Sequence, residues 1–476
     1  MRKIVIIGGG IAGLAAAVRF QDALREGAPL ECTVLEASEH FGGKIHTLRK
    51  DGFIIERGPD SFITQKPAAV QLCRKLGLGD HIVGTLPENK TYVYLNRRML
   101  TLPDGLSLMV PTKFLPFLTT PLFTWPGKVR MGLDLLIPRR RGNADESLAG
   151  FVRRRFGQEA VERLAQPLLS GIYSSDPEQM SMKATFPRFL ETEKKYGSLI
   201  LGMLAAKKEM MKRRLSGNGN YQSYSMFVTL KNGMSELVET LIEQCPDIRF
   251  RAGSPIRSLA KGKGGYTITL ESGETLEADG VLAATPANVT AGLLAAVAPE
   301  ISQRLGRIPF VSTAAVVLGY AREGFGHPLR GFGFVVPATE GRRITACTWV
   351  SSKFPGRAPE DKVLLRAFVG GALREPLAEQ APEKILSDVL EELRDIMGLT
   401  ATPEFTHVFQ YRKGNVQYHV NHEELVNAVE RDLKGHPGLF LAGSAYRGIG
   451  IPDCVANGTQ AAERALDFLE SLAGRR

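Results

Sequence analysis

Residues 4–13 read Ile-Val-Ile-Ile-Gly-Gly-Gly-Ile-Ala-Gly, and an alanine-rich segment follows them. The apolar run predicts a buried strand, the alanine-rich segment predicts a helix, and the glycines form the turn between them. Gly8 permits the tight turn, Gly10 lets the backbone approach a pyrophosphate closely, and Gly13 lets the helix pack against the strand. The free N–H groups of the helix N-terminus then face the phosphates. The stretch predicts a dinucleotide-binding βαβ unit whose cofactor contacts are Gly8, Gly9, Gly10, Ile11, Ala12 and Gly13.

An acidic residue, Glu36, ends the next apolar run directly after Leu35 and lies 23 residues beyond Gly13. In dinucleotide-binding units a carboxylate about 20 residues beyond the glycines accepts a hydrogen bond from a ribose hydroxyl. The same charge repels the 2′-phosphate of NADP, so these residues favour FAD or NAD. A glycine-rich turn that only joins a strand to a helix is the alternative, and the matching acid argues against it.

Three further segments distinguish between the two dinucleotides. Gly42-Gly43-Lys44 and Gly58-Pro59-Asp60-Ser61 follow the acid, and a glycine-rich loop, 444–453, separates an apolar strand from a helix predicted to begin near Val455. These residues resemble the superfamily of FAD-dependent amine oxidases and protoporphyrinogen oxidases. The resemblance implies a bound FAD, with Ile256 at its adenine end and Tyr411 beside the flavin. The other implied contacts are Leu35, Glu36, Gly43, Lys44, Gly58, Pro59, Asp60, Ser61, Gly443, Ile449, Gly450 and Ile451.

Within that superfamily the chain is similar, over essentially its whole length, to the porphyrinogen oxidases of Gram-positive bacteria. The motifs that carry the similarity are Gly58–Phe62 with Lys66, Pro111–Phe114, Gln166–Tyr173, Ser181-Met182 with Thr185–Pro187, Thr345–Trp349, Gln417–Val420 and Gly448–Cys454. The similarity implies an oxygen-dependent FAD oxidase of haem biosynthesis. It would convert coproporphyrinogen III to coproporphyrin III, pass six electrons to dioxygen as three hydrogen peroxides, and accept protoporphyrinogen IX as well.

The same similarity assigns residues to the substrate. Lys66 would orient a propionate, because a coproporphyrinogen carries four of these carboxylates. A solvated lysine is the alternative. Gly171, Ile172 and Tyr173 would line the pocket, or would form a tight turn between helices. No dedicated catalytic acid or base is expected, since a pyrrole N–H beside an oxidised meso carbon loses its proton readily.

Three other functions stay open at this point. Protoporphyrinogen IX could be the main substrate. An amine oxidase or a polyene oxidase would need no recognition of four carboxylates. A flavin-free carrier with the same fold is the third, and the intact nucleotide-binding segments argue against it.

The composition is that of a globular enzyme with two or three domains, with 476 residues of which 43% are hydrophobic and 23% charged. Five scattered cysteines without a Cys-x-x-Cys pair argue for a reducing compartment and against a disulfide framework or a zinc site. His419 and His422 lack a third ligand, so we expect a polar surface segment there and no metal.

The net charge of +10 admits nucleic acid, an anionic membrane or an acidic ligand as a partner. The basic clusters 139–141, 153–155 and 207–214 are expected to be solvated helix faces, because no nucleic-acid-binding motif surrounds them. We therefore expect a porphyrinogen and dioxygen as partners and no nucleic acid. Docking of other haem-pathway enzymes on the basic faces stays open.

We expect a cytoplasmic protein, because the apolar start is a strand that ends in the glycines and not the core of a signal peptide. The most hydrophobic stretch, 105–125, contains Lys113 and three prolines, so it predicts no transmembrane helix. Its apolar side chains predict peripheral contact with the inner face of the cell membrane, a wall of the substrate pocket, or a core loop. These side chains are Leu115, Phe117, Leu118, Leu122, Phe123 and Trp125.

The predicted fold class is mixed α/β, with a Rossmann-like FAD-binding domain of the amine oxidase type, an interleaved sheet-based substrate domain and a helical insert. The FAD-binding domain takes 1–55, 225–296 and 434–476, the substrate domain takes 56–90, 190–224 and 297–433, and the helical insert takes 91–189. Within these, 248–278 predicts a β-meander, 232–242 and 383–397 predict helices, and 90–215 predicts mostly helix.

Overall fold

The chain forms two compact units that alternate along the sequence. The computed structural model describes residues 1–87, 90–107, 110–111, 113–215, 225–262, 264–473. The first unit comprises Met1–Gly84, Tyr224–Pro309 and His422–Arg476, and the second comprises Thr85–Ser223 and Phe310–Asn421. The finer division into three domains stays a prediction.

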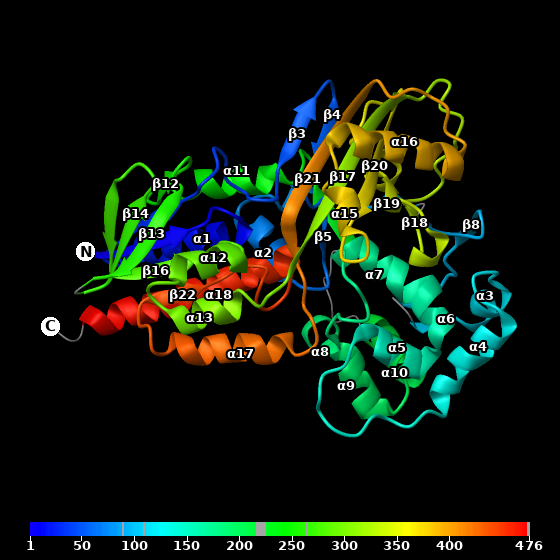
Figure 1. Ribbon diagram of the computed structural model, residues 1–476, viewed down its shortest axis with the longest axis horizontal. Helices are drawn as coiled ribbons and strands as arrows, with labels where there is room; N and C mark the ends of the chain where they lie inside the picture. The colour runs from blue at the N-terminus through cyan, green and yellow to red at the C-terminus, as the bar shows by residue number, and fades with distance from the viewer. Residues whose placement is uncertain (88–89, 108–109, 112, 216–224, 263, 474–476) are drawn as a thin grey trace. The chain divides into compact units, whose positions relative to one another are not determined.

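A five-stranded parallel sheet organises the first unit, in the order β12-β2-β1-β16-β22. Its strands are β1 (Arg2–Ile7), β2 (Leu30–Leu35), β12 (Arg249–Arg251), β16 (Gly280–Ala283) and β22 (Leu439–Leu441). Helix α1 (Ile11–Arg25) connects β1 to β2, as Figure 1 shows in blue. The predicted βαβ unit is therefore present, and residues from three distant parts of the chain complete its sheet.

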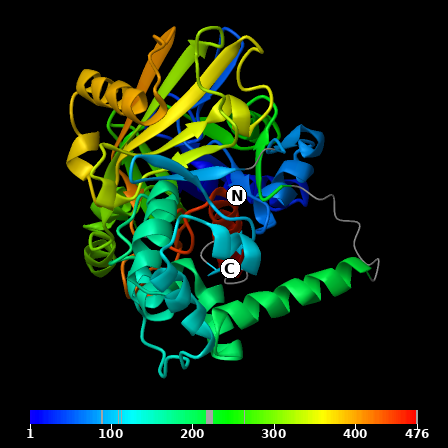
Figure 2. The same ribbon diagram turned by 90° about the vertical axis from the view of Figure 1, so that its right-hand side faces the viewer.

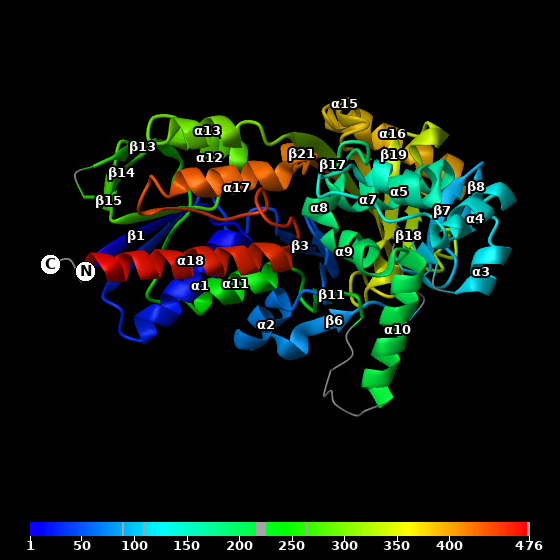
Figure 3. The same cartoon turned by 90° about the horizontal axis from the view of Figure 1, so that it is seen from below.

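Helices α1, α11 and α18 share one hydrophobic core with β1 and β2. Figures 1 and 3 show α18 alongside α1. The helices of this unit are α1, α2 (Ala68–Lys75), α11 (Ser235–Glu243), α12 (Ala287–Leu294), α13 (Pro299–Leu305), α17 (His422–Leu433) and α18 (Ile451–Ala473). Smaller antiparallel pieces are β3 (Thr47–Lys50) with β4 (Phe53–Glu56), and β5 (Phe62–Ile63), β11 (Phe227–Leu230) and β6 (Ile82–Gly84).

Two local predictions in this unit are corrected. The meander comprises only β13 (Ile256–Lys261), β14 (Tyr266–Leu270) and β15 (Thr275–Ala278), because β12 pairs in parallel with β2 instead. Alternation along a strand does not specify its partner. Helix α18 begins at Ile451 and not near Val455. Pro452 is accommodated in the first helical turn, where its missing N–H has no intrahelical partner to lose.

A seven-stranded sheet organises the second unit, in the order β21-β17-β20-β19-β18-β7-β8. All neighbours are antiparallel except the pair of β18 and β7. The strands are β7 (Thr91–Leu95), β8 (Arg98–Thr101), β17 (Phe310–Ala321), β18 (Gly333–Val335), β19 (Ile344–Trp349), β20 (Lys362–Gly370) and β21 (Phe405–Val416). Helix α16 (Pro382–Met397) packs against side chains of this sheet and shares a hydrophobic core with them.

A helical layer shares a second core with this sheet. Its helices are α3 (Phe114–Thr119), α4 (Trp125–Gly132), α5 (Leu148–Phe156), α6 (Gln158–Ala160), α7 (Gln166–Tyr173), α8 (Met182–Thr185), α9 (Pro187–Tyr196) and α10 (Leu199–Leu215). Figure 2 shows α10 projecting from the other helices of its unit. The prediction of mostly helix over 90–215 is correct from 114 onward, but β7, β8, β9 (Leu106–Ser107) and β10 (Val110–Pro111) occupy its first part.

The basic cluster 153–155 is a solvated helix face only at Arg153, which is exposed. Arg155 is fully buried and bonds Asp134 at 3.2 Å and Glu193 at 2.5 Å. Arg154 bonds Glu193 at 2.6 Å as well. A guanidinium can be buried when carboxylates satisfy its donors, so this cluster stabilises the packing of α5 against α9.

The apolar side chains predicted at 115–125 divide into two groups. Phe117, Leu122 and Phe123 are buried in the core of the second unit, whereas Leu115 and Trp125 are 72% and 66% exposed. In the described part of the chain, no helix combines the length and the apolar character needed to cross a bilayer.

Candidate functional site

The glycine loop after β1 has the conformation that the sequence predicts. Gly8 has a φ of 106°, which favours glycine, and its N–H donates to Leu35 O at 2.8 Å. A Cβ on Gly13 would lie 2.0 Å from Gly8 O, so only glycine allows α1 to pack this closely. At Gly10 a Cβ would meet nothing within 4 Å, which leaves open space beside the loop and the first turn of α1.

Glu36, directly after β2, is hydrogen-bonded to this loop. One carboxylate oxygen accepts from Gly9 N at 2.8 Å, and the other accepts from the backbone N–H and hydroxyl of Ser38 at 2.9 and 2.8 Å. Ser254 N also donates to the Glu36 carbonyl at 2.8 Å. The predicted ribose-binding carboxylate therefore stands at the carboxyl end of the sheet, next to the glycines.

The segment at Gly42-Gly43 lies against this loop, and Gly58 lies against the next residue, Lys44. Gly10 and Gly42 form an isolated parallel bridge, and a Cβ on Gly43 would lie 3.3 Å from Gly10 Cα. A Cβ on Gly58 would come within 1.9 Å of Lys44 O. Three segments that the sequence separates by up to 50 residues thus form one continuous wall.

The C-terminal segment completes the same edge of the sheet. Gly443 has a φ of 124°, and Asn457 of α18 holds it by accepting from Gly443 N at 2.9 Å and donating to Gly443 O at 3.2 Å. Ile451 begins α18, so the free N–H groups of this long helix lie beside the predicted contacts Ile449 and Gly450. Both helix N-termini of the site, α1 and α18, can therefore face an anionic ligand.

Lys66 has a specific partner in this unit. Its Nζ donates to both carboxylate oxygens of Asp453, at 2.6 and 2.8 Å, and its side chain is 51% exposed. Asp453 lies in the first turn of α18. Lys66 is therefore an exposed lysine with an ion-pair partner, and neither the predicted contact with substrate nor the alternative of a solvated lysine is tested.

Burial changes the ionisation of two neighbours of this pair. Burial of the amine lowers the pKa of Lys44 to about 8, although the residue as a whole is exposed. Burial raises the pKa of the Cys454 thiol to about 12, and the Asp453 charge adds to this effect. Cys454 is accordingly a neutral thiol at neutral pH.

The other predicted residues are spread over both units. Ile256 begins β13 in the first unit, two residues after Ser254, whose N–H bonds Glu36. Tyr411 lies on β21 of the second unit, so its predicted packing beside the flavin stays a prediction. Pro59, Asp60 and Ser61 precede β5, and the Ser61 hydroxyl donates to Asp60 at 2.6 Å.

The substrate residues predicted on α7 lie in the second unit. A Cβ on Gly171 would meet Val335 at 3.6 Å, so α7 packs closely on β18. Ile172 is 62% exposed, and the Tyr173 ring contacts Phe186 edge to face. Gly171, Ile172 and Tyr173 are therefore part of a helix and do not form a tight turn between helices.

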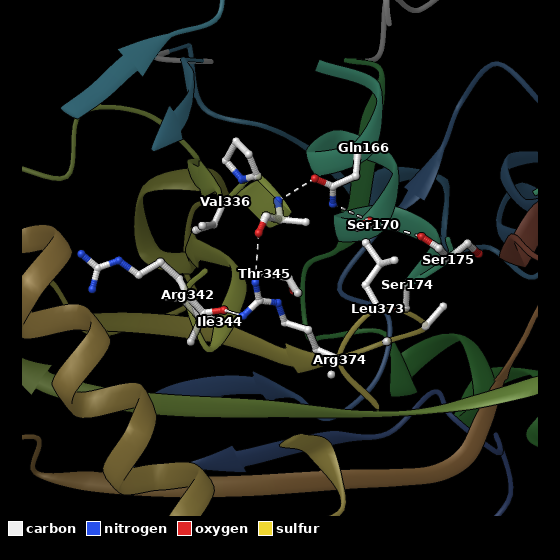
Figure 4. Close-up of a pocket in the computed structure, with 15 residues that line it drawn as sticks. Gln166, Ser170, Ser174, Ser175, Val336, Arg342, Ile344, Thr345, Leu373 and Arg374 are labelled. Carbon is white, nitrogen blue, oxygen red and sulfur yellow. Dashed lines mark hydrogen bonds between the residues drawn. The ribbon is translucent and has the colours of Figure 1, made fainter. Parts of the chain in front are cut away.

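A small hollow of the second unit adjoins α7, as Figure 4 shows. Gln166 accepts from Ala338 N at 2.7 Å and donates to Ser170 Oγ at 3.0 Å, and Arg374 donates to the Ala338 and Arg342 carbonyls. These polar groups bond one another, so the hollow is a junction between α7 and the loop at 336–343. None of the three predicted substrate residues lines it.

The segment that holds His419 and His422 is not the polar surface segment that the sequence predicts, because Gln417, Tyr418 and His422 are buried. His422 Nε2 is 3.2 Å from Tyr446 O in the first unit, and His419 belongs to the second. Among the residues that the structure describes, no three His, Cys, Asp or Glu side chains are grouped to hold a metal ion.

These features define an oxidoreductase-type dinucleotide site on a two-unit α/β fold. The glycine cradle, the open space at Gly10, Glu36 and the two helix N-termini fit FAD, since they supply a pyrophosphate site and a ribose acceptor. The model for flavin containing amine oxidoreductases matches residues 11–466, and this chain belongs to that family. The family confirms the predicted FAD cofactor and the predicted class of flavin oxidoreductase.

Close relatives cover the whole chain. The coproporphyrinogen III oxidase of Bacillus subtilis (strain 168) is 40% identical, with 99% of each chain covered. The enzyme of the same name from Staphylococcus aureus (strain NCTC 8325 / PS 47) is 32% identical, over 98% of this chain and 99% of its own. A crystal structure from Exiguobacterium sp. 255-15, named as a protoporphyrinogen oxidase, has a TM-score of 0.86 and 34% identity, with 98% and 99% covered. The predicted resemblance is confirmed.

Sequence reasoning missed three residues that organise the site. Ser38 and Asn457 hold Glu36 and Gly443, and Asp453 holds Lys66. The motif Gly448–Cys454 contained Asp453, but only the fold brings this aspartate to a lysine 387 residues earlier.

Proposed function

We propose that this chain catalyses the FAD-dependent and oxygen-dependent oxidation of coproporphyrinogen III to coproporphyrin III in haem biosynthesis. The observation that carries the proposal is the 40% identity to the Bacillus subtilis coproporphyrinogen III oxidase over 99% of both chains. Each catalytic round removes two electrons, so three rounds consume three dioxygen molecules and release three hydrogen peroxides. Bound FAD supplies the hydride acceptor that dioxygen regenerates.

The residues of this chain would bind and orient the substrate. A coproporphyrinogen is an apolar ring with four carboxylates, and Lys66 presents a half-exposed ammonium next to the N-terminus of α18. Holding the ring in one orientation places a meso carbon at the hydride acceptor. Gly171, Ile172, Tyr173 and Tyr411 are proposed to contact the ring or the flavin, which is consistent with the exposure of Ile172.

Turnover of two substrates tests this proposal. Protein purified without oxygen and carrying a flavin absorbance spectrum is mixed in air with coproporphyrinogen III or protoporphyrinogen IX. Porphyrin fluorescence and peroxide are then measured together. We expect faster formation of coproporphyrin III, with three peroxides for each porphyrin. Faster oxidation of protoporphyrinogen IX would make that compound the main substrate, and a yellow protein inert toward both would favour an amine or polyene oxidase.

We also propose peripheral contact with an anionic membrane through α3, α4 and the segment directly after α4. Six exposed apolar side chains support it. These side chains are Phe114, Leu115, Leu118, Trp125, Val129 and Leu136.

Tryptophan fluorescence tests the membrane proposal, because Trp125 is 66% exposed and the second tryptophan, Trp349, is buried. Phosphatidylglycerol vesicles should shift the emission to shorter wavelength, and phosphatidylcholine vesicles should shift it less. Trp125→Ala should abolish the shift and weaken cosedimentation. Val289→Ser, which removes an exposed apolar side chain of the first unit, should have no effect. An unchanged spectrum with both lipids would refute the contact.

A further inference from the structure

The ion pair of Lys66 and Asp453 joins two segments of the first unit at the predicted flavin site. Lys66 follows β5 and precedes α2, and Asp453 lies in the first turn of α18. Both carboxylate oxygens accept from Nζ, at 2.6 and 2.8 Å. The aspartate side chain is 17% exposed and the lysine side chain 51% exposed. The carboxylate is therefore the anchored member of the pair, and the ammonium is the accessible one.

The surroundings of Asp453 fix the carboxylate in place. A Cβ on Gly448 would lie 2.3 Å from Asp453 Cγ, so the backbone turn before α18 lies directly against this side chain. Gly448 has a φ of 104°, which allows that turn. Asp453 also stands where the dipole of a 23-residue helix stabilises a negative charge. Backbone and helix together hold the charge at one position.

A lysine anchored in this way retains capacity for a second anion. An ammonium has three N–H donors, and one carboxylate occupies the side of Nζ that faces α18. In the described part of the chain, no third acceptor bonds Nζ. A lysine side chain has many rotamers, and the ion pair selects among them before any ligand arrives.

We propose that Asp453 is a positioning residue, which holds the Lys66 ammonium where it receives a carboxylate of the substrate. The inference rests on the proposed function, and it assigns a role to a residue that does not itself contact the carboxylate. Asp453 acts through Lys66, so its removal should weaken substrate binding without slowing the chemical steps.

An ion pair that only stabilises the packing of the segment after β5 against α18 would have the same geometry. The test must therefore distinguish this structural role from the positioning of Lys66 for substrate. Four proteins form a double-mutant cycle: the wild type, Asp453→Asn, Lys66→Ala and the double variant. Each is loaded with FAD, and KM and kcat are measured for coproporphyrinogen III. The affinity for the product coproporphyrin III, which has the same four carboxylates, is measured separately by fluorescence quenching.

We expect Asp453→Asn to raise KM about two- to fivefold, the range that a half-exposed ion pair contributes, with kcat within about twofold of wild type. The product dissociation constant should rise by the same factor. In the Lys66→Ala background the aspartate substitution should have no further effect. Asp453→Glu keeps the negative charge and should restore KM to within about twofold of the wild-type value, because the flexible lysine side chain can adjust to the shifted carboxylate.

A matched control is available in the same unit. The pair of Lys75 and Asp22 has similar exposed fractions, 45% and 21%, and lies between α2 and α1. Asp22→Asn should leave KM and product affinity at wild-type values.

Several results would overturn the proposal. One is an equal effect of Asp453→Asn in the wild type and in Lys66→Ala. Another is a lower KM in Asp453→Asn, which would mean that the aspartate competes with the substrate. If Asp453→Asn fails to retain flavin, Asp453→Glu carries the test, and a KM raised more than about twofold over the wild type in that variant also overturns it. Flavin-loaded wild type inert toward both porphyrinogens would refute the proposed function itself, whereas an active wild type with an additive cycle refutes only this inference.

Discussion

Gly458→Ala tests how closely α18 must approach α1 for the flavin site to form. A Cβ at this position would lie 2.1 Å from Ala12 O and 2.9 Å from Ala12 C. Ala12 belongs to the first turn of α1, directly after the glycine loop. The added methyl group therefore presses on backbone that cannot rotate away, at the point where the loop should hold a pyrophosphate.

The expected magnitude follows from this geometry. Ordinary carbon–oxygen contacts lie beyond about 3 Å, so the helices must separate by roughly 1 Å, and such overpacking costs about 1–3 kcal/mol. Alanine is a better helix former than glycine by about 1 kcal/mol, which offsets part of that cost. We expect a net loss of about 1–2 kcal/mol, because the clash is with backbone, together with weaker retention of FAD.

Gly292→Ala is the matched control. Gly292 lies in α12 of the same unit, and a Cβ there would meet nothing within 4 Å. This variant gains the helix propensity without the clash, so it should be unchanged or up to about 1 kcal/mol more stable. The two substitutions are chemically identical, and their difference isolates the contact with Ala12.

Flavin release on heating measures the change in stability that each of the two substitutions causes. The rise of flavin fluorescence marks the melting of the first unit, which should shift by about 2–4 °C for each kcal/mol. The melting temperature of Gly458→Ala should fall below that of the wild type and that of Gly292→Ala. Equal melting temperatures and flavin contents for the two variants would refute the argument that the approach of α18 to α1 determines the site.

Three more predictions follow from buried or half-buried charges and their hydrogen bonds. Glu36→Gln should raise the FAD dissociation constant about 10- to 100-fold in a fluorescence titration, because the side chain loses the negative charge that strengthens its bonds to Gly9 N and to the predicted ribose hydroxyl. A change below twofold would contradict this role. Arg155→Met should destabilise the second unit by about 3–5 kcal/mol in chemical denaturation, since buried carboxylates lose their partner, whereas Arg153→Met at an exposed pair should cost less than about 1 kcal/mol. Burial raises the pKa of Glu193, but hydrogen bonds from its arginine neighbours outweigh burial and hold this pKa below 4.5. The stabilisation is therefore present above pH 4.5 and is lost as the pH falls through the pKa of the folded state. Glu193→Gln should flatten the acid branch of the curve of unfolding free energy against pH.

The sequence by itself determined the parts of the site that depend on local geometry. A glycine run between an apolar strand and an alanine-rich helix can form only a few turns, so the βαβ unit and Glu36 were predictable and are present. The whole-chain motifs determined the family for the same reason, since each motif is a contiguous segment.

Only the tertiary structure decided the features that depend on distant pairing. Alternation at 248–250 did not reveal that this strand joins β2, and a run of three arginines did not reveal that Arg155 is buried among carboxylates. In the same way, the apolar stretch near 120 could not show which side chains face the core. The partner of Lys66 lies 387 residues away, and the glycine that lets α18 approach α1 lies beyond every recognised motif. Local sequence limits the conformations of each segment, whereas close packing of segments far apart in the chain selects their partners.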